Sequence, residues 1–187
     1  MKNPRVMKKS QAEIRLALRG HKRIREKDVF ELSYLKAVIK ETLRLHPPAP
    51  LLPRECRVPC RVDEYEIQTK TRVIINAWAI GRDPEYWDQP ERFLPERFID
   101  SSVSFYKESC NNFAYIPFGA GRRMCPGMSS GLASVEIALA HLLYHFDWEL
   151  PPGTEPESLD MTEAFGASVG RKRNLCLTAI PFAPNEE

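Results

Sequence analysis

The sequence predicts a mainly α-helical protein with small β-sheets, an α+β fold, and this expectation rests on three observations. Residues 33–45 carry apolar side chains at the spacing of one helix face. Residues 126–146 form a longer run that is apolar on nearly all sides, which is typical of a helix deep in a core. Short β-branched runs such as Arg72–Ile75, separated by turns and prolines, predict small sheets.

The N-terminal part of the chain predicts two helices with a linker between them. Asn3 is a suitable N-cap and a proline follows it, so a helix is expected over Pro4–Gly20. Residues 21–31 are charged and predict the linker. The second helix is expected over Ser33–Leu45, because the two prolines after His46 cannot continue it. Its predicted core face consists of Leu35, Val38, Ile39, Thr42 and Leu43.

The rest of the chain predicts strands, a long connection and a last helix. β-branched runs within 54–76 predict short strands joined by turns. Residues 83–112 are polar, aromatic and rich in proline, and they predict a meander with a turn or two of helix. The apolar helix is expected over Pro126–Phe146, and Leu175–Ile180 predicts a strand in the tail.

Length and charge narrow the class of protein. The chain has the length of one ordinary domain, so residues 1–187 are expected to form a single one. The 27 Lys and Arg against 25 Asp and Glu give no global attraction to nucleic acid. Residues 1–28 are basic, which suits an acidic partner or, as the favoured interpretation, a solvated face. With no signal peptide and no run of about eighteen apolar residues, no transmembrane segment is expected in this chain.

The cysteines and histidines give little support for a disulfide framework or a zinc site. The cysteine count is odd and lacks the spacing of a disulfide framework, which favours reduced thiols facing the cytosol. His141 and His145 have the spacing of a zinc pair, but the glutamate of an H-E-x-x-H motif is absent. Cys56 and Cys60 lack a second pair at ligand spacing. Both groups are therefore interpreted as structural.

Cys125 lies in a setting that suits a haem ligand. It directly precedes the apolar helix, whose positive N-terminal end would stabilise a thiolate. Pro126 suits the first helical position, where no N–H is needed. A thiolate ligand pushes electron density onto haem iron and favours O–O cleavage. The alternative interpretation is a glycine-rich loop with a structural cysteine.

The neighbours of Cys125 suit the same ligand. Gly121 and Gly127 permit turns or a close backbone approach that a Cβ would block. Arg123 can form charge-assisted hydrogen bonds to a haem propionate. Phe118 can cover the sulfur and keep water from it.

The spacing F-x-x-G-x-R-x-C-x-G over residues 118–127 resembles the haem-binding loop of the cytochrome P450 family at every fixed position. The likeness extends to Phe182, and residues 117–127 and 160–166 are similar to plant microsomal A-type members. The resemblance implies the C-terminal part of the cytochrome P450 fold, incomplete, in which Cys125 is the axial ligand of the iron of haem b (iron protoporphyrin IX).

The resemblance also implies an activity and its partners. Family members are monooxygenases that use O₂ and take electrons from NADPH through a NADPH-cytochrome reductase flavoprotein. The implied substrate is an apolar small molecule, here a plant secondary metabolite. The implied location is the cytosolic face of the endoplasmic reticulum membrane.

Charged residues upstream match further family positions. An E-x-x-R on a helix carries little information alone, and the alternative is a set of unrelated surface charges. Here Glu41 and Arg44 precede a His-Pro-Pro end, and Arg97 follows in a P-E-R-F segment, in the order of the family's Glu-Arg-Arg triad. The triad's implied role is to hold the meander beneath the haem. Arg54 matches a position whose basic side chain meets a haem propionate.

Two apolar segments match loops that contact substrate in the family, although each could equally be ordinary packing. The candidates are Pro50, Leu51, Leu52, Phe165, Ala167 and Ser168.

The chain is well under half of a full-length member, which leaves three hypotheses. The membrane anchor and the distal helix with its acid–alcohol pair lie outside it, so no catalytic residue is expected here. The chain is then a portion of a monooxygenase, or a catalytically inactive haem-binding module or truncated pseudoenzyme. The third hypothesis is a structural fragment without cofactor, whose apolar helix 126–146 would drive aggregation.

Overall fold

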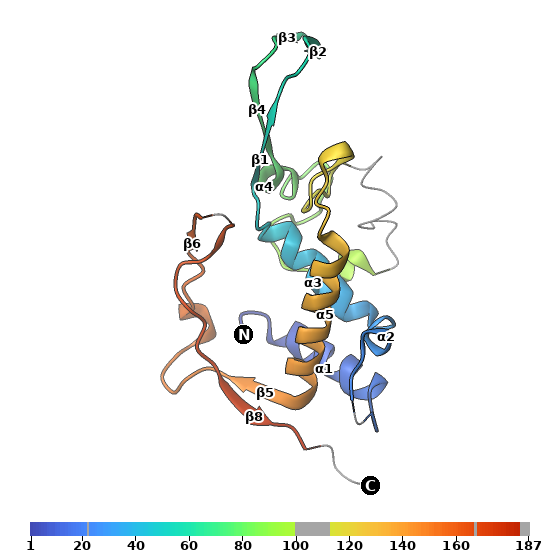
Figure 1. Cartoon of the computed structure of the whole chain (residues 1–187). Coiled ribbons are helices and arrows are strands. Elements are labelled where there is room, and N and C mark those ends of the chain that lie inside the picture. The colour runs from blue at the N-terminus through green and yellow to red at the C-terminus, as the bar shows by residue number, and fades with distance from the viewer. Residues whose placement is uncertain (22, 100–112, 167, 184–187) are drawn as a thin grey trace.

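Helices α1, α3 and α5 form the body of the molecule, and small two-stranded sheets lie around them (Figure 1). The computed structural model describes residues 1–21, 23–99, 113–166 and 168–183. Helices α1 and α3 pack on each other and on α5, which α2 also contacts. The helices are α1 (Pro4–Ala17), α2 (Glu26–Val29), α3 (Ser33–Leu45), α4 (Ala77–Ile80) and α5 (Met128–His145), with 3₁₀ turns η1 (Pro95–Phe98), η2 (Gly121–Arg123) and η3 (Pro156–Ser158).

The strands pair in antiparallel twos. A long ribbon projects from the helices and carries one pair near its base and a second pair at its far end (Figure 1). The C-terminal segment lies to one side of the helical body and contains two further pairs. The pairs are β1 (Leu51–Glu55) with β4 (Arg72–Asn76), β2 (Cys60–Val62) with β3 (Tyr65–Ile67), β5 (Phe146–Glu149) with β8 (Thr178–Pro181), and β6 (Glu163–Ala164) with β7 (Gly170–Arg171).

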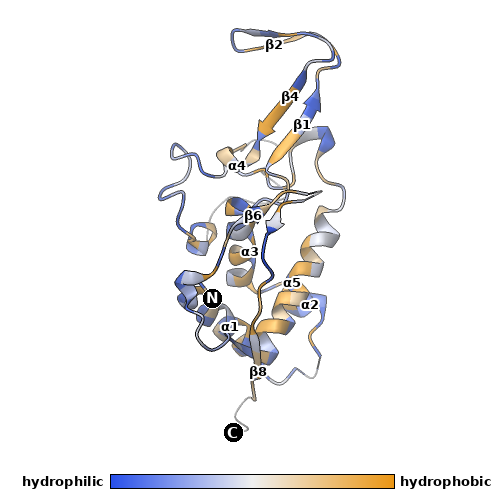
Figure 2. Cartoon of the chain, turned by 90° about the vertical axis from the view of Figure 1, so that its left-hand side faces the viewer, coloured by the Kyte–Doolittle hydropathy of each residue, from blue (hydrophilic) through white to orange (hydrophobic). Residues whose placement is uncertain are grey.

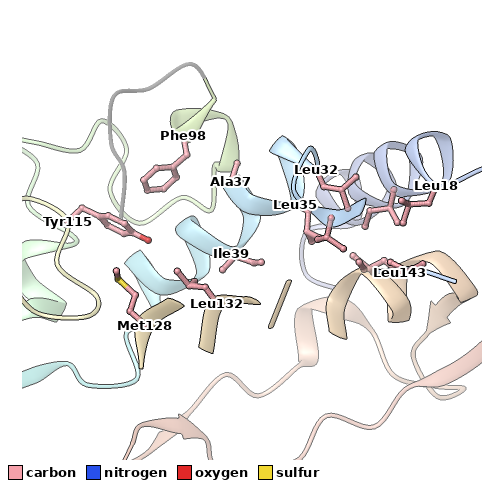
Figure 3. Close-up of a cluster of buried hydrophobic side chains, with 14 of the residues drawn as sticks. Leu18, Leu32, Leu35, Ala37, Ile39, Phe98, Tyr115, Met128, Leu132 and Leu143 are labelled. Atoms are coloured by element: carbon pink, nitrogen blue, oxygen red, sulfur yellow. The ribbon is translucent and has the colours of Figure 1, made fainter. Parts of the chain in front are cut away.

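An apolar core fills the space between α1, α3 and α5 and continues towards η1 (Figure 3). Four leucines meet at one end of this core: Leu18 just after α1, Leu32 just before α3, Leu35 in α3 and Leu143 in α5. At the other end the Phe98 and Tyr115 rings lie 5.2 Å apart between centroids, and the Trp87 ring lies 5.7 Å from that of Phe98. The aromatic cluster holds η1 and the segment before the cysteine loop against α3.

The α+β prediction is confirmed, with differences at particular elements. The prediction of a linker over 21–31 is wrong in part, because α2 forms there and buries Val29 against the core. Asn3 precedes α1, but its side chain makes no capping hydrogen bond. The last strand begins at Thr178 rather than at Leu175. The predicted bounds of α3 are those of the structure.

The predicted core face of α3 is partly wrong. Thr42 is exposed, and Val38 and Leu43 are only half-buried. Glu41 and Arg44 are fully buried instead. Apolar periodicity misses them because charged side chains are buried only where they satisfy each other, which a hydrophobic pattern does not record.

Helix α5 differs from its prediction in its start and its surroundings. It begins at Met128 after the N-cap Gly127, so Pro126 precedes the helix and does not occupy its first position. Val135 and Leu142 are 46% and 43% exposed on a helix that is largely hydrophobic (Figure 2). Its buried residues are Met128, Leu132, Ala140 and Leu143. Within the described ranges, no helix combines the length and the apolar character needed to cross a bilayer.

Candidate functional site

The loop before α5 folds back on itself around two glycines. Gly119 has φ 73° and Gly121 has φ 69°, which is the left-handed region that glycine adopts without a steric penalty. The backbone N–H of Cys125 donates to the carbonyl oxygen of Phe118 at 3.0 Å, and that of Met124 donates to Gly121 at 3.1 Å. These hydrogen bonds fix the position of the Cys125 backbone at the end of the loop, just before α5.

The Cys125 thiol is exposed and lies close to the N-terminal end of α5. Among the described residues, apart from its chain neighbours, a Cβ placed on Gly127 would meet only the Cys125 Sγ, at 4.0 Å, which leaves space beside this sulfur. A helix N-terminus favours negative charge through its unsatisfied N–H groups. The loop therefore presents a sulfur that is accessible to a group from outside the chain.

Strand β1 brings two more predicted residues to this loop. A Cβ placed on Gly119 would lie 3.5 Å from Arg54 Nη2 and 3.8 Å from Leu52 Cδ1. The Arg54 Nη1 donates to the carbonyl oxygen of Pro53 at 2.8 Å. Arg123 is exposed in η2, and Phe118 is half-buried where the loop packs against the core. A thiol, guanidinium groups and an aromatic ring thus lie on one loop and the strand beside it.

These residues fit a haem group by the chemistry of the donors they present. Haem iron needs a single axial ligand from this side, and haem propionates need positive or N–H donors. The loop would offer Cys125 for the first role, and Arg123 of η2 and Arg54 of β1 would serve the second. Among residues with described placement, no cluster of three or more His, Cys, Asp or Glu could hold a metal ion by itself.

Glu41 lies between two arginines in the interior. Arg44 donates from Nε to Glu41 Oε2 at 2.7 Å and from Nη2 to Oε1 at 2.9 Å, and both side chains are 0% exposed. Arg97 of η1 donates from Nε to the same Oε1 at 3.2 Å, with its side chain 12% exposed. The structure therefore brings together the three residues that the sequence analysis grouped.

The same network holds the backbone of the meander. Arg44 Nη1 donates to the carbonyl oxygens of Gly81 at 2.6 Å and Pro90 at 2.7 Å. The backbone N–H of Leu94 donates to Glu41 Oε1 at 2.7 Å. Arg97 Nη1 donates to the carbonyl oxygen of Asp88 at 2.9 Å. Helix α3 is thereby fastened to the segment 81–97 through its two buried charges.

Two residues of this network were not expected from the sequence. A Cβ on Gly81 would lie 2.7 Å from the carbonyl oxygen of Arg44, so only glycine allows this approach. The Trp87 ring lies 5.1 Å from the Arg44 guanidinium, and its Nε1 donates to the carbonyl oxygen of Ala114 at 3.2 Å. A tryptophan in a polar, proline-rich stretch is a signal for a buried anchor that could have identified Trp87.

The two segments predicted to contact substrate lie next to each other. The backbone N–H of Val169 donates to the carbonyl oxygen of Pro48 at 2.8 Å, and His46 Nδ1 lies 3.0 Å from Glu163 Oε1. Leu51 and Phe165 are 50% and 81% exposed. Of the remaining candidates, Ser168 is exposed, Pro50 and Leu52 are half-buried, and Ala167 lies outside the described residues.

Two other features are separate from the cysteine loop. The His141 and His145 rings stack with centroids 5.6 Å apart, and the described part of the chain supplies no third metal ligand to them. An apolar cavity of about 320 Å³ lies between α1, α3, α5 and the C-terminal segment. Its lining includes Val6, Leu35, Leu143 and Met161 but no residue of the cysteine loop.

The fold and the loop define a class of protein with an exposed cysteine presented just before a helix. The cytochrome P450 family model matches residues 1–177, and the chain belongs to the cytochrome P450 family. A solved zebrafish cytochrome P450 with abiraterone superposes with a TM-score of 0.83 at 30% sequence identity, over 98% of this chain and 42% of that one.

Similar curated proteins come from plants. The chain is 62% identical over 177 residues to cytochrome P450 71D8 of Glycine max, covering 95% of this chain and 34% of that protein. It is 64% identical over 187 residues to desmethyl-deoxy-podophyllotoxin synthase of Sinopodophyllum hexandrum, covering 100% of this chain and 36% of that protein. Premnaspirodiene oxygenase of Hyoscyamus muticus is 56% identical over 188 residues, covering 100% and 37%. The chain thus spans about a third of the length of these relatives.

Proposed function

We propose that Cys125 is the axial thiolate ligand of a haem b iron and that Arg54 and Arg123 bind haem propionates. The observation that carries this proposal is the Cys125 loop, in which an exposed thiol lies close to the N-terminal end of α5 beside a position without a Cβ. When bound, a thiolate-ligated haem supplies reductive activation of O₂.

The chain's own residues would support the ligand in three ways. The N–H groups at the start of α5 and the positive end of its dipole stabilise negative charge on the Cys125 sulfur. With haem bound, Phe118 would keep water from the sulfur, and Gly121 provides the turn that brings the loop back to α5. Glu41, Arg44 and Arg97 fasten α3 to the meander, so they position the site without touching the haem.

The proposed reaction is NADPH- and O₂-dependent oxidation of an apolar small molecule by the protein of which this chain forms the haem-binding portion. Relatives named as an oxygenase and as a synthase of a podophyllotoxin compound support a plant secondary metabolite as substrate. The exposed Leu51 and Phe165 offer apolar contacts for it. Electrons would come through a NADPH-cytochrome reductase flavoprotein at the cytosolic face of the endoplasmic reticulum.

A carbon monoxide difference spectrum of the reduced, haem-reconstituted chain tests the ligand. We expect the Soret shift of a thiolate-ligated haem in the unsubstituted chain and its loss in Cys125→Ala. Cys176→Ala is the matched control, since that thiol is also exposed but lies outside the loop, and it should keep the shift. A shift that persists in Cys125→Ala would refute the assignment, and haem uptake without turnover would favour the inactive haem-binding module.

A further inference from the structure

Two thiols lie close together where the projecting ribbon changes from its first strand pair to its second. Cys56 directly follows β1, and Cys60 is the first residue of β2. Their Sγ atoms are 3.9 Å apart. Cys60 is exposed and Cys56 is half-buried, and the ribbon end that carries them stands away from the helices (Figure 1).

Backbone hydrogen bonds hold both cysteines in place. The N–H of Cys56 donates to the carbonyl oxygen of Thr71 at 2.9 Å, and its own carbonyl accepts from the N–H of Lys70 at 2.7 Å. Cys60 is registered opposite Ile67 in the β2–β3 pair. The pairing of the ribbon therefore fixes the backbone positions of the two cysteines.

Disulfide formation requires the two sulfurs to move closer than their present 3.9 Å. A disulfide bond is about 2.05 Å long, so the two sulfurs must approach by roughly 2 Å. The Cys56 Sγ now donates to the carbonyl oxygen of Val58 at 3.0 Å, a weak bond that a rotation would release.

We propose that Cys56 and Cys60 form a redox-active dithiol, a modification site that closes to an intramolecular disulfide on reaction with hydrogen peroxide. The Cys60 thiolate attacks one peroxide oxygen, the O–O bond breaks, and a sulfenic acid and water result after proton uptake. The Cys56 sulfur then attacks the sulfenic sulfur and expels a second water. The two thiols lose two electrons and two protons in all, and one peroxide becomes two waters.

The environments of the two thiols support this order of events. Cys60 is the exposed member of the pair and is the sulfur that an oxidant reaches first. Burial raises the pKa of the Cys56 thiol, and its hydrogen bond with Cys60 adds to the effect. Disulfides of proteins that face the cytosol are usually transient and redox-sensing, which suits an exposed, reversible pair.

Arg57 lies between the two cysteines and makes the disulfide easy to identify. Trypsin cleaves after Arg54, Arg57 and Arg61, so residues 55–57 and 58–61 become separate peptides unless a disulfide joins them. After peroxide treatment and alkylation of free thiols, we expect the joined pair of peptides by mass spectrometry, lighter than their sum by two hydrogen atoms. Dithiothreitol should separate them. Cys176→Ser should still give the joined pair, whereas Cys56→Ser and Cys60→Ser should not.

A second measurement tests the reduced pair independently of oxidation. Phenylarsine oxide bridges two neighbouring thiols, and we expect it to protect Cys56 and Cys60 together from alkylation in the reduced chain and to leave Cys176 reactive. Sulfinic or sulfonic acid at Cys60 without a joined peptide would overturn the proposal. Disulfide-linked dimers in place of the joined peptides would overturn it as well. Neither readout involves haem, so the outcome is independent of the Cys125 assignment.

Discussion

Three donors surround the Glu41 carboxylate in the interior. Arg44, Arg97 and the backbone N–H of Leu94 all donate to its oxygens. A buried ion network of this kind tolerates no missing member, since the remaining charge is left without compensation. The residue therefore contributes more to stability than surface charges of the same type.

Replacing Glu41 with glutamine should destabilise the chain by about 3–5 kcal/mol, because two guanidinium groups lose their counter-charge in the interior. Urea unfolding measures this free energy. Glu91→Gln is the matched control, because Glu91 pairs with Arg82 at 3.3 Å but its side chain is 71% exposed. Its effect should stay below about 1 kcal/mol. Equal effects of the two substitutions would contradict the buried network.

Glu96 should make the stability fall in acid. The hydrogen bond from Arg5 lowers the pKa of Glu96 from 4.5 to about 2, against the opposing effect of burial. A carboxylate with a depressed folded-state pKa contributes stability above its unfolded value of 4.5 and loses it as the pH falls towards about 2. Urea unfolding of the unsubstituted chain should show this loss across that interval, and Glu96→Gln should show a smaller loss. The same slope in both would contradict the assignment.

At the scale of elements, the backbone of α3 approaches Gly81 too closely for any residue with a Cβ to stand at position 81. A Cβ on Gly81 would lie 2.7 Å from the carbonyl oxygen of Arg44, which is backbone and cannot move without shifting α3. The Arg44 guanidinium binds the Gly81 carbonyl at the same point. Helix α3 and Gly81 are thus joined at the same point by a hydrogen bond and by a close backbone contact.

Gly81→Ala should therefore destabilise the chain by about 1–3 kcal/mol, as overpacking does. Gly131→Ala is the matched control on α5, where an added Cβ meets no atom of the described residues within 4 Å. It should stabilise the chain by about 0.5–1 kcal/mol through the better helix propensity of alanine. Thermal unfolding of both variants distinguishes the effects, and a neutral Gly81→Ala would mean that α3 and the meander separate easily.

The elements show which parts of the structure a sequence pattern can predict. The end of α3 was predictable because prolines follow His46, and the spacing of Cys125 among its glycines identified the loop. The burial of Trp87 could have been expected from its residue type, but its partner and that of Gly81 could not, because both are backbone carbonyls far along the chain. Glu41 and Arg44 interrupt the apolar pattern of α3, so periodicity alone assigned its core face wrongly.

At the scale of the whole molecule, α5 presents an apolar stripe to solvent. Val135 and Leu142 lie two turns apart on the same side of the helix and are 46% and 43% exposed, with the exposed Ala138 between them. The sequence predicted a helix deep in a core, because a helix that is apolar on nearly all sides normally packs on all of them. The exposed stripe differs from that prediction. The exposed stripe favours self-association of the chain.

A Val135→Ser, Leu142→Ser double variant should remain monomeric at higher concentration than the unsubstituted chain, as measured by light scattering. Leu16→Ser is the control, because Leu16 is 78% exposed on α1 and lies outside the stripe. It should change the association little. If Leu16→Ser had the larger effect, the α5 stripe would not be the surface that associates.

The buried charge network also has a consequence for the order in which the chain folds. Glu41 and Arg44 are three positions apart, so they can pair as soon as the last turns of α3 form. Arg97 is 56 positions from Glu41. The carbonyl acceptors of Arg44 at Gly81 and Pro90 lie 37 and 46 residues further along the chain. Closing loops of this length costs entropy before the contacts repay it. During synthesis on the ribosome, α3 can therefore form before the carbonyl acceptors of Arg44 have emerged. We expect the complete network to form late in folding.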